Sequence, residues 1–271
     1  MIPSVDSVMG PGPTSLLDHH SHLDDPGADV SCLNRQLHEL REAGWPGALL
    51  PGYGPARHER ARQLVAEFPC LFRAIGLHPE ALALCADDQQ RQEAWLSLCE
   101  ELQAPQVVAI GEIGLDQRYR KQMSLSQQNA WFIKGLELAQ QQGLPVVLHI
   151  VGWHGHALAA LAPFAPLQGV VHRYSGPPEL VDAYEALGLH LSLSPEAGVA
   201  ERKRESVARA IAADRLLLET DWPQGDQSYP EALRAMQGML AQVSEWQQEN
   251  PNKLAQRLAE NARRVYRTAW R

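Results

Sequence analysis

The stretch VVAIGEIGLD, residues 107–116, combines the features that decide both the fold and the chemistry of this chain. It is apolar at successive positions, which is typical of a parallel strand covered by helices. One carboxylate, Glu112, interrupts the apolar run, and Asp116 ends it. A buried carboxylate without compensation carries a large desolvation cost, which a bound cation would remove. The stretch therefore predicts a buried strand that delivers an acidic group to a cation.

Similar short apolar runs recur along the chain and alternate with stretches rich in Ala, Glu, Gln and Leu. The predicted strands begin near Leu16, Gly47, Leu71, Val107, Pro145, Gly169, His190 and Arg215. Helices are predicted over 33–43, 56–67, 89–102, 126–142, 178–187, 201–213 and 252–271. A spacing of about 28 residues suits a strand, a crossover helix and two loops. The pattern predicts the α/β class and a single-domain (β/α)8 TIM barrel.

An open, doubly wound sheet is the alternative arrangement of such units. It would be expected to carry a nucleotide fingerprint such as GxGxxG after a strand, and the sequence has none. Residues 1–14, rich in Pro and Gly, are predicted to be a flexible leader, and residues 15–271 to form the barrel.

Composition narrows the classes of function. The formal net charge of −8 argues against a general basic surface for nucleic acid. No apolar run approaches the ~20 residues that span a bilayer, and the first residues lack a signal-peptide pattern. The four cysteines form no CxxC pair, so reduced thiols and a cytoplasmic location are expected.

Ionisable residues are concentrated where the predicted strands end. They are Asp18, His20 and His22 after the first run, His78 after the third, Glu112 and Asp116 in the fourth, His149 after the fifth, His172 after the sixth, and Asp221 after the eighth. Strand ends on one face of a barrel converge on its mouth. Taken singly, each has an ordinary structural explanation, such as a histidine bonded to a carbonyl or an aspartate capping a helix. Together they predict a metal site.

The ligand types favour certain ions. Side chains two apart on a strand point to the same side, with Cα atoms roughly 6.5 Å apart, so His20 and His22 can both reach one ion. No cysteine belongs to the set, and mixed imidazole and carboxylate groups suit Zn²⁺, Mn²⁺ or Mg²⁺. Four histidines and two carboxylates exceed the needs of one tetrahedral ion, whereas two ions bridged by a carboxylate would use them all.

The same motifs, taken in order, resemble those of the TatD family of metal-dependent deoxyribonucleases, within the amidohydrolase-like barrels. The resemblance runs from about Leu16 to Tyr266. The matching stretches are DHHSHLD at 18–24, GLHP at 76–79, GEIGLD at 111–116, LPVVLH at 144–149, VVHRYSG at 170–176, LLETDWP at 217–223 and NARRVY at 261–266.

The resemblance implies a role for each residue of the set. One divalent ion would be held by His20, His22, Glu112 and Asp221, and a second by Glu112, His149 and His172, with Glu112 as the bridge. Asp18 would orient a histidine, and His78 and Asp116 would help position substrate. The implied chemistry is hydrolysis of a DNA phosphodiester by an ion-activated water, with Asp221 as the candidate proton acceptor.

The sequence also departs from the family pattern in the loops that would meet the substrate. An expected Arg-bearing segment after His149 is replaced by IVGWHGHALAAL, and the loop after LETDWP is shorter than usual. Arg173 directly follows a predicted ligand, where it could contact phosphate or form a salt bridge.

The favoured hypothesis is a deoxyribonuclease that acts on single-stranded or frayed DNA. Two alternatives remain: an amidohydrolase-like enzyme for a small-molecule amide, lactone or phosphoester, and a non-enzymatic subunit of a larger assembly. A carboxylated lysine often bridges the metals of other amidohydrolases, and Glu112 in that position favours the TatD-like hypothesis.

Overall fold

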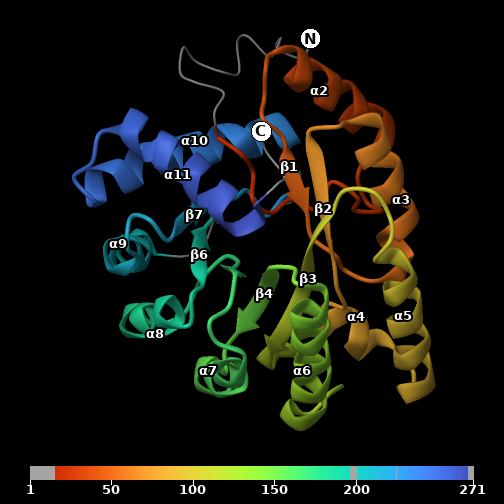
Figure 1. Cartoon of the computed structure of the whole chain (residues 1–271). Helices are drawn as coiled ribbons and strands as arrows, with labels where there is room; N and C mark the ends of the chain where they lie inside the picture. Colours follow the sequence, from red (N-terminus) through yellow and green to blue (C-terminus); the bar gives the residue numbers. More distant parts are fainter. Residues whose placement is uncertain (1–15, 196–199, 224, 268–271) are drawn as a thin grey trace.

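The computed structural model describes residues 16–195, 200–223 and 225–267, so the predicted leader over 1–14 lies outside the described residues. Parallel strands follow one another around a curled sheet in the order of the sequence (Figure 1). They are β1 (Ala48–Leu50), β2 (Leu71–Ile75), β3 (Val107–Asp116), β4 (Val146–Val151), β5 (Gly169–Val171), β6 (His190–Leu193) and β7 (Leu216–Leu218). The predicted α/β barrel architecture is confirmed.

Helices cover the outside of this sheet (Figure 1). They are α2 (Val30–Glu42), α3 (Pro55–Glu67), α4 (Pro79–Leu84), α5 (Asp88–Glu101), α6 (Leu125–Gln142), α7 (His154–Leu161), α8 (Val181–Ala186), α9 (Glu201–Ala210), α10 (Tyr229–Trp246) and α11 (Pro251–Tyr266). In α11, Leu254, Leu258 and Val265 are buried at helical spacing, so one face of this helix is apolar.

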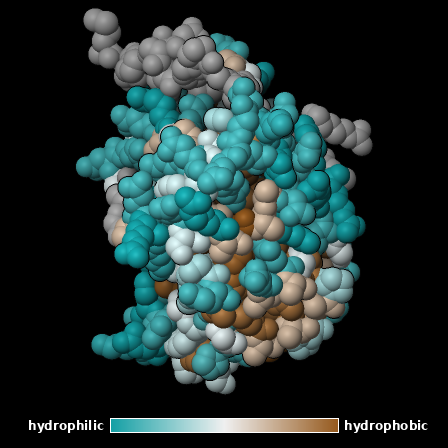
Figure 2. All heavy atoms as spheres, turned by 90° about the vertical axis from the view of Figure 1, so that its left-hand side faces the viewer, coloured by the Kyte–Doolittle hydropathy of each residue, from teal (hydrophilic) through white to brown (hydrophobic). Residues whose placement is uncertain are grey.

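The outward faces of these helices are mostly polar. On the side of the molecule that carries α7 to α11, most of the surface is hydrophilic, and hydrophobic side chains gather in its lower half (Figure 2). Within the described residues, no helix is both long enough and apolar enough to cross a membrane.

The segment predicted as the first strand is not a regular strand. It makes two isolated parallel bridges, Asp18 with Ala48 and Ser21 with Trp222. Its backbone bonds to β1 on one side, through Leu49 N to Asp18 O at 2.9 Å, and to the residues after β7 on the other, through His22 N to Trp222 O at 2.7 Å. The segment thus closes the barrel.

The interior of the barrel changes from apolar to polar along the strands. Its lower layer consists of Leu49, Ala74, Ala109, Val147, Val170 and Leu217, together with Val265 and Tyr266 from the end of α11. Side chains two apart on a strand share a face. The next inward positions on β4 and β5 are therefore His149 and His172, and Glu219 follows β7 in the same way.

A register irregularity in β3 gives Glu112 its orientation. Strict alternation from Ala109 would turn Ile113 inward. The pairing of β3 with β4 shifts between Ile110 and Ile113, and Ile113 instead belongs to the core between sheet and helices. Irregularities of this kind re-aim side chains, and here the side chain brought to the interior is Glu112.

Gly47, which directly precedes β1, has a positive φ and lies against the backbone of Cys70. Gly143, which follows α6, also has a positive φ but has open space around it. At Gly47, with φ of 114°, an added Cβ would lie 1.8 Å from the carbonyl oxygen of Cys70, whereas at Gly143, with φ of 62°, nothing lies within 4 Å. Gly47→Ala should cost more than about 3 kcal/mol of unfolding free energy because backbone must move. Gly143→Ala, the matched control, should cost only ~1–2 kcal/mol. Urea denaturation measures both, and equal costs would contradict the steric explanation.

Candidate metal centre

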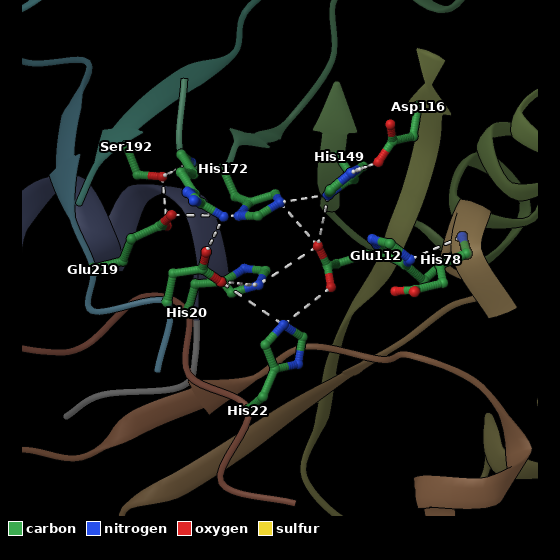
Figure 3. A network of polar contacts seen from close by, with 12 residues as sticks. His20, His22, His78, Glu112, Asp116, His149, His172, Ser192 and Glu219 are labelled. Carbon is green, nitrogen blue, oxygen red and sulfur yellow. Dashed lines mark hydrogen bonds and ion pairs between the residues drawn. The ribbon is translucent and has the colours of Figure 1, made fainter. Parts of the chain in front are cut away.

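His20, His22 and Glu112 approach one another at the mouth of the barrel (Figure 3), and both histidines also lie near Asp221. The Nε2 atom of His20 lies 3.6 Å from Glu112 Oε2 and 3.7 Å from Asp221 Oδ1. The Nε2 atom of His22 lies 3.5 Å from Glu112 Oε1 and 3.8 Å from Asp221 Oδ1. Ligands about 2.1 Å from a tetrahedral ion are separated by about 3.4 Å. The observed separations therefore fit a divalent cation with little adjustment.

A second group of ligand atoms shares Glu112. Glu112 Oε2 lies 2.9 Å from His172 Nε2 and 3.3 Å from His149 Nδ1, and these two nitrogens are 2.9 Å apart. Glu112 lies between the two groups (Figure 3). Three overlapping sets of possible ligands are recognised among the described residues: His20, Glu112 and His172; His20, His22 and Asp221; and His78, Glu112 and His149.

Buried atoms without hydrogen-bond partners support a cation at this place. His20 Nε2 and Glu112 Oε1 are both buried, and neither atom has a hydrogen-bond partner. Leaving a buried polar atom unsatisfied costs about 1–3 kcal/mol, and more for a charged group. A divalent ion between these atoms would satisfy both of them. The imidazole and carboxylate donors found here therefore fit the divalent ion that the sequence predicts.

Burial and the neighbouring charges shift the pKa values of the candidate ligands in both directions: those of Glu112 and His22 favour the metal-binding form, whereas His172 and Asp221 are shifted toward the protonated form, so a cation would have to displace their protons. Burial opposes ionisation of Glu112, but the surrounding imidazoles of His20 and His172 hold its pKa well below the usual range. Burial lowers the pKa of His22 well below its usual value, so its imidazole is neutral, as a ligand must be. Burial raises the pKa of Asp221. For His172, burial is outweighed by Glu112 and Glu219, which hold its pKa well above the usual value.

Asp116 fixes the ring of His149. Its Oδ2 accepts a hydrogen bond from His149 Nε2 at 2.9 Å, and that bond leaves Nδ1 directed at Glu112. The Arg118 guanidinium binds the same carboxylate, at 2.6 Å to Oδ2. A carboxylate behind a histidine sets the tautomer and orientation that metal binding needs. Asp116 thus lies beside the candidate ligands, as predicted, but contacts a histidine.

Asp18 also lies beside the site and acts on the backbone. Its carboxylate accepts hydrogen bonds from His20 N, from Thr220 N and Oγ1, and from Tyr229 OH, at 2.6 to 3.2 Å. It was expected to orient a histidine, and it holds the main chain of His20 rather than the imidazole. Burial raises the pKa of Asp18 to about 6.

His78 and Arg173 complete the predicted set. The His78 ring stacks on Tyr53 with centroids 5.0 Å apart and meets the edge of His149 at 4.2 Å. Arg173 Nη1 donates to Asp221 Oδ2 at 2.7 Å, so the salt bridge considered for this arginine is present. All ten predicted residues therefore lie in one connected cluster at the mouth of the barrel.

Sequence analysis missed Glu219 and Ser192. Glu219 Oε1 lies 3.3 Å from His172 Nδ1, and Ser192 Oγ donates to Glu219 Oε2 at 2.5 Å (Figure 3). Glu219 thus stands behind His172 as Asp116 stands behind His149. The signal was available, because Glu219 is a carboxylate that follows the apolar run LLL, just as Glu112 interrupts one.

The fold and the site together define a class: an α/β-barrel hydrolase whose histidines and carboxylates gather at the C-terminal ends of the strands, where such enzymes bind metals and substrates. The family model "TatD related DNase" matches residues 17–267. The chain belongs to the TatD family and is a metal-dependent hydrolase.

Individual relatives agree with this assignment. The "3'-5' ssDNA/RNA exonuclease TatD" of Yersinia pseudotuberculosis is 33% identical over 247 residues, which cover 85% of this chain and 92% of that protein. The "uncharacterized metal-dependent hydrolase YjjV" of Escherichia coli K12 is 30% identical over 262 residues, covering 91% and 95%. The crystal structure of YjjV from E. coli K12 superposes with a TM-score of 0.80 at 27% identity, covering 94% of this chain and 99% of that one.

The position of Glu219 behind His172 predicts an effect on metal affinity. Glu219→Ala should weaken metal binding to the group that contains His172 by about 10- to 100-fold, the usual effect of removing such a partner. Glu219→Gln should lose less, because its amide oxygen can still accept from His172. Isothermal titration of metal-free protein with Zn²⁺ or Mn²⁺ measures both. Unchanged affinity in a folded Ala variant would contradict the role.

Proposed function

We propose that this chain is a two-metal exonuclease that shortens single-stranded DNA from its 3′ end. The observation that carries the proposal is the shared position of Glu112 between two groups of ligand atoms. Two ions bridged by one carboxylate form the arrangement that serves in-line displacement at phosphorus. The activity named for the Yersinia relative, a 3'-5' exonuclease of single-stranded DNA and RNA, supports the same substrate class.

Each ion would be held by side chains already in place. His20, His22, Glu112 and Asp221 would hold one, and Glu112, His149 and His172 the other. Bound divalent ions supply Lewis acidity, which lowers the pKa of water and neutralises charge on phosphate oxygens. Zn²⁺, Mn²⁺ and Mg²⁺ all remain compatible with the imidazole and carboxylate donors.

Asp221 is suited to accept a proton from the attacking water. Its Oδ1 faces His20 and His22, while its Oδ2 faces Arg173 at 2.7 Å. Burial raises its pKa, which makes the carboxylate a better base than an exposed aspartate. Its two oxygens thus have separate surroundings, so ligation and proton transfer can be divided between them.

His78 would act as a neutral hydrogen-bond donor. Its Nδ1 accepts a hydrogen bond from Glu80 N at 3.0 Å, so the proton of the neutral ring resides on Nε2. Burial lowers its pKa well below the usual value, with His149 adding to the effect. A protonated Nε2 cannot bind a metal, but it can donate to a phosphate oxygen or a leaving oxygen.

The surroundings of the site favour a strand end over a duplex. The net charge of −8 provides no extended basic surface. The cavity beside His149 and His172 measures about 200 Å³, which is smaller than the pockets of about 300–1,000 Å³ typical of drug-sized ligands. A frayed or single-stranded end can bring one phosphate group into such a space, whereas continuous double helix cannot.

The central test is cleavage of end-labelled DNA in Mg²⁺, Mn²⁺ or Zn²⁺. Wild type should shorten single strands from the 3′ end and should cleave blunt duplex more slowly, and EDTA should abolish both activities. Glu112→Ala should lose at least about 1,000-fold in rate, because both ligand groups lose their shared member. Hydrolysis of small esters or lactones without cleavage of DNA or RNA would overturn the nuclease proposal and leave the hydrolase class intact.

A second test concerns His78. Replacement by Gln should lower kcat by about 100-fold, the usual effect of removing one donor to a developing anion. The pH dependence of the residual activity should match that of wild type, because a histidine that stays neutral does not titrate in the working range. Loss of either limb of the pH profile in the variant would show that His78 titrates in the working range and would contradict the assignment.

A further inference from the structure

A small cavity beside the second ligand group is flanked by two arginines. It measures about 200 Å³ and is lined by Arg118, His149, Ile150, Val151, His172, Arg173 and Ser175. The two guanidinium groups come from different parts of the barrel: Arg118 follows β3 and Arg173 follows β5. The cavity therefore joins two cations to the two histidines that accompany Glu112.

Each arginine forms an ion pair in which the guanidinium side chain is more exposed than its carboxylate partner. The side chain of Arg118 is 59% exposed and that of its partner Asp116 is 0% exposed. Arg173 is 33% exposed and its partner Asp221 is 9% exposed. The carboxylates hold the guanidinium groups in place, and the cavity is lined by the two arginines but not by Asp116 or Asp221. Guanidinium groups fixed in this way suit the bidentate recognition of phosphate.

We propose that Arg118 and Arg173 form an anion subsite for a phosphate group of the substrate next to the one that is cleaved. The cavity is lined by His149 and His172 but not by His20, His22 or Asp221. A group inside it therefore lies to one side of Glu112 rather than across both ligand groups. The volume suits a phosphate more than a complete nucleotide. This inference rests on the proposed function for its choice of substrate.

The phosphate can come from two places on a strand. It can be a monoester at the 3′ terminus, or the next diester of the chain. Both present oxygens to the same two guanidinium groups, so the experiment separates the sources by varying the end of the substrate.

The first measurement uses inorganic phosphate and metal-free full-length protein, which removes any contribution from the ions. Isothermal titration should show saturable binding that weakens about tenfold in Arg118→Gln and in Arg173→Gln, the effect of losing one charge-assisted contact. Glutamine keeps a donor toward Asp116 or Asp221 and limits disturbance of the fold. Arg120→Gln is the matched control: it removes an exposed charge from the same loop, and it does not line the cavity.

The second measurement compares 5′-labelled single strands that end in a 3′-phosphate or a 3′-hydroxyl. If the subsite binds a terminal monoester, wild type should have the lower KM for the phosphate end, and both Gln variants should lose the difference. If it binds an internal diester, the two ends should give equal KM, and both variants should raise it equally.

Wild-type protein that shows no saturable phosphate binding, or Gln variants that bind phosphate as wild type does, would overturn the subsite. A chain that binds phosphate through these arginines but cleaves neither strand would retain the subsite and refute the nuclease function.

Discussion

The carboxylate of Asp18 joins the first and last parts of the barrel, and the site depends on that junction. Its hydrogen bonds reach the backbone of His20 and both the backbone and hydroxyl of Thr220, residues that are 200 positions apart in sequence. Tyr229 closes the network from the start of α10. Because His20 and His22 lie on one side of the junction and Asp221 on the other, the distances among these ligands are set by barrel closure. The candidate metal centre thus depends on the contacts that close the sheet as well as on the individual strands.

Glu112 is a buried carboxylate whose desolvation cost must be offset by its neighbours. It is 1% exposed, and four imidazoles lie within reach of its two oxygens. Without compensation, such burial would cost several kcal/mol. The structure offsets it in two layers, since His149 and His172 surround Glu112 and are themselves held by Asp116 and Glu219. The outer carboxylates set the directions of the rings, so the geometry around Glu112 exists before an ion arrives.

Much of this could be predicted from the sequence, and the limits have physical causes. The repeat of apolar runs predicted the barrel, and buried charges at strand ends predicted where Glu112 and Asp221 would meet. Alternation alone would have placed Ile113 inside instead of Glu112, because the register shift of β3 leaves no mark in local composition. The segment at Leu16 was expected to be a strand, but its pairing consists of isolated bridges, Asp18 with Ala48 and Ser21 with Trp222, instead of a continuous ladder. Glu219 was overlooked because its neighbour Asp221 already explained the charge after β7.

The arrangement of ion pairs explains how a chain with a net charge of −8 can still expose guanidinium groups at the mouth of the barrel. Net charge governs the field at long range, whereas recognition at the mouth depends on charges within a few ångströms, less than the Debye length of about 8 Å at physiological salt. At that range the exposed halves of the pairs decide the local potential, and at Arg118 and Arg173 those halves are guanidinium groups. The buried negative halves of these pairs are the carboxylates of Asp116 and Asp221. Asp116 contacts the candidate ligand His149, and Asp221 is itself a candidate ligand. Charge at the entrance and geometry at the candidate metal centre therefore share Asp116 and Asp221, because each carboxylate contacts an arginine on one side and a histidine on the other.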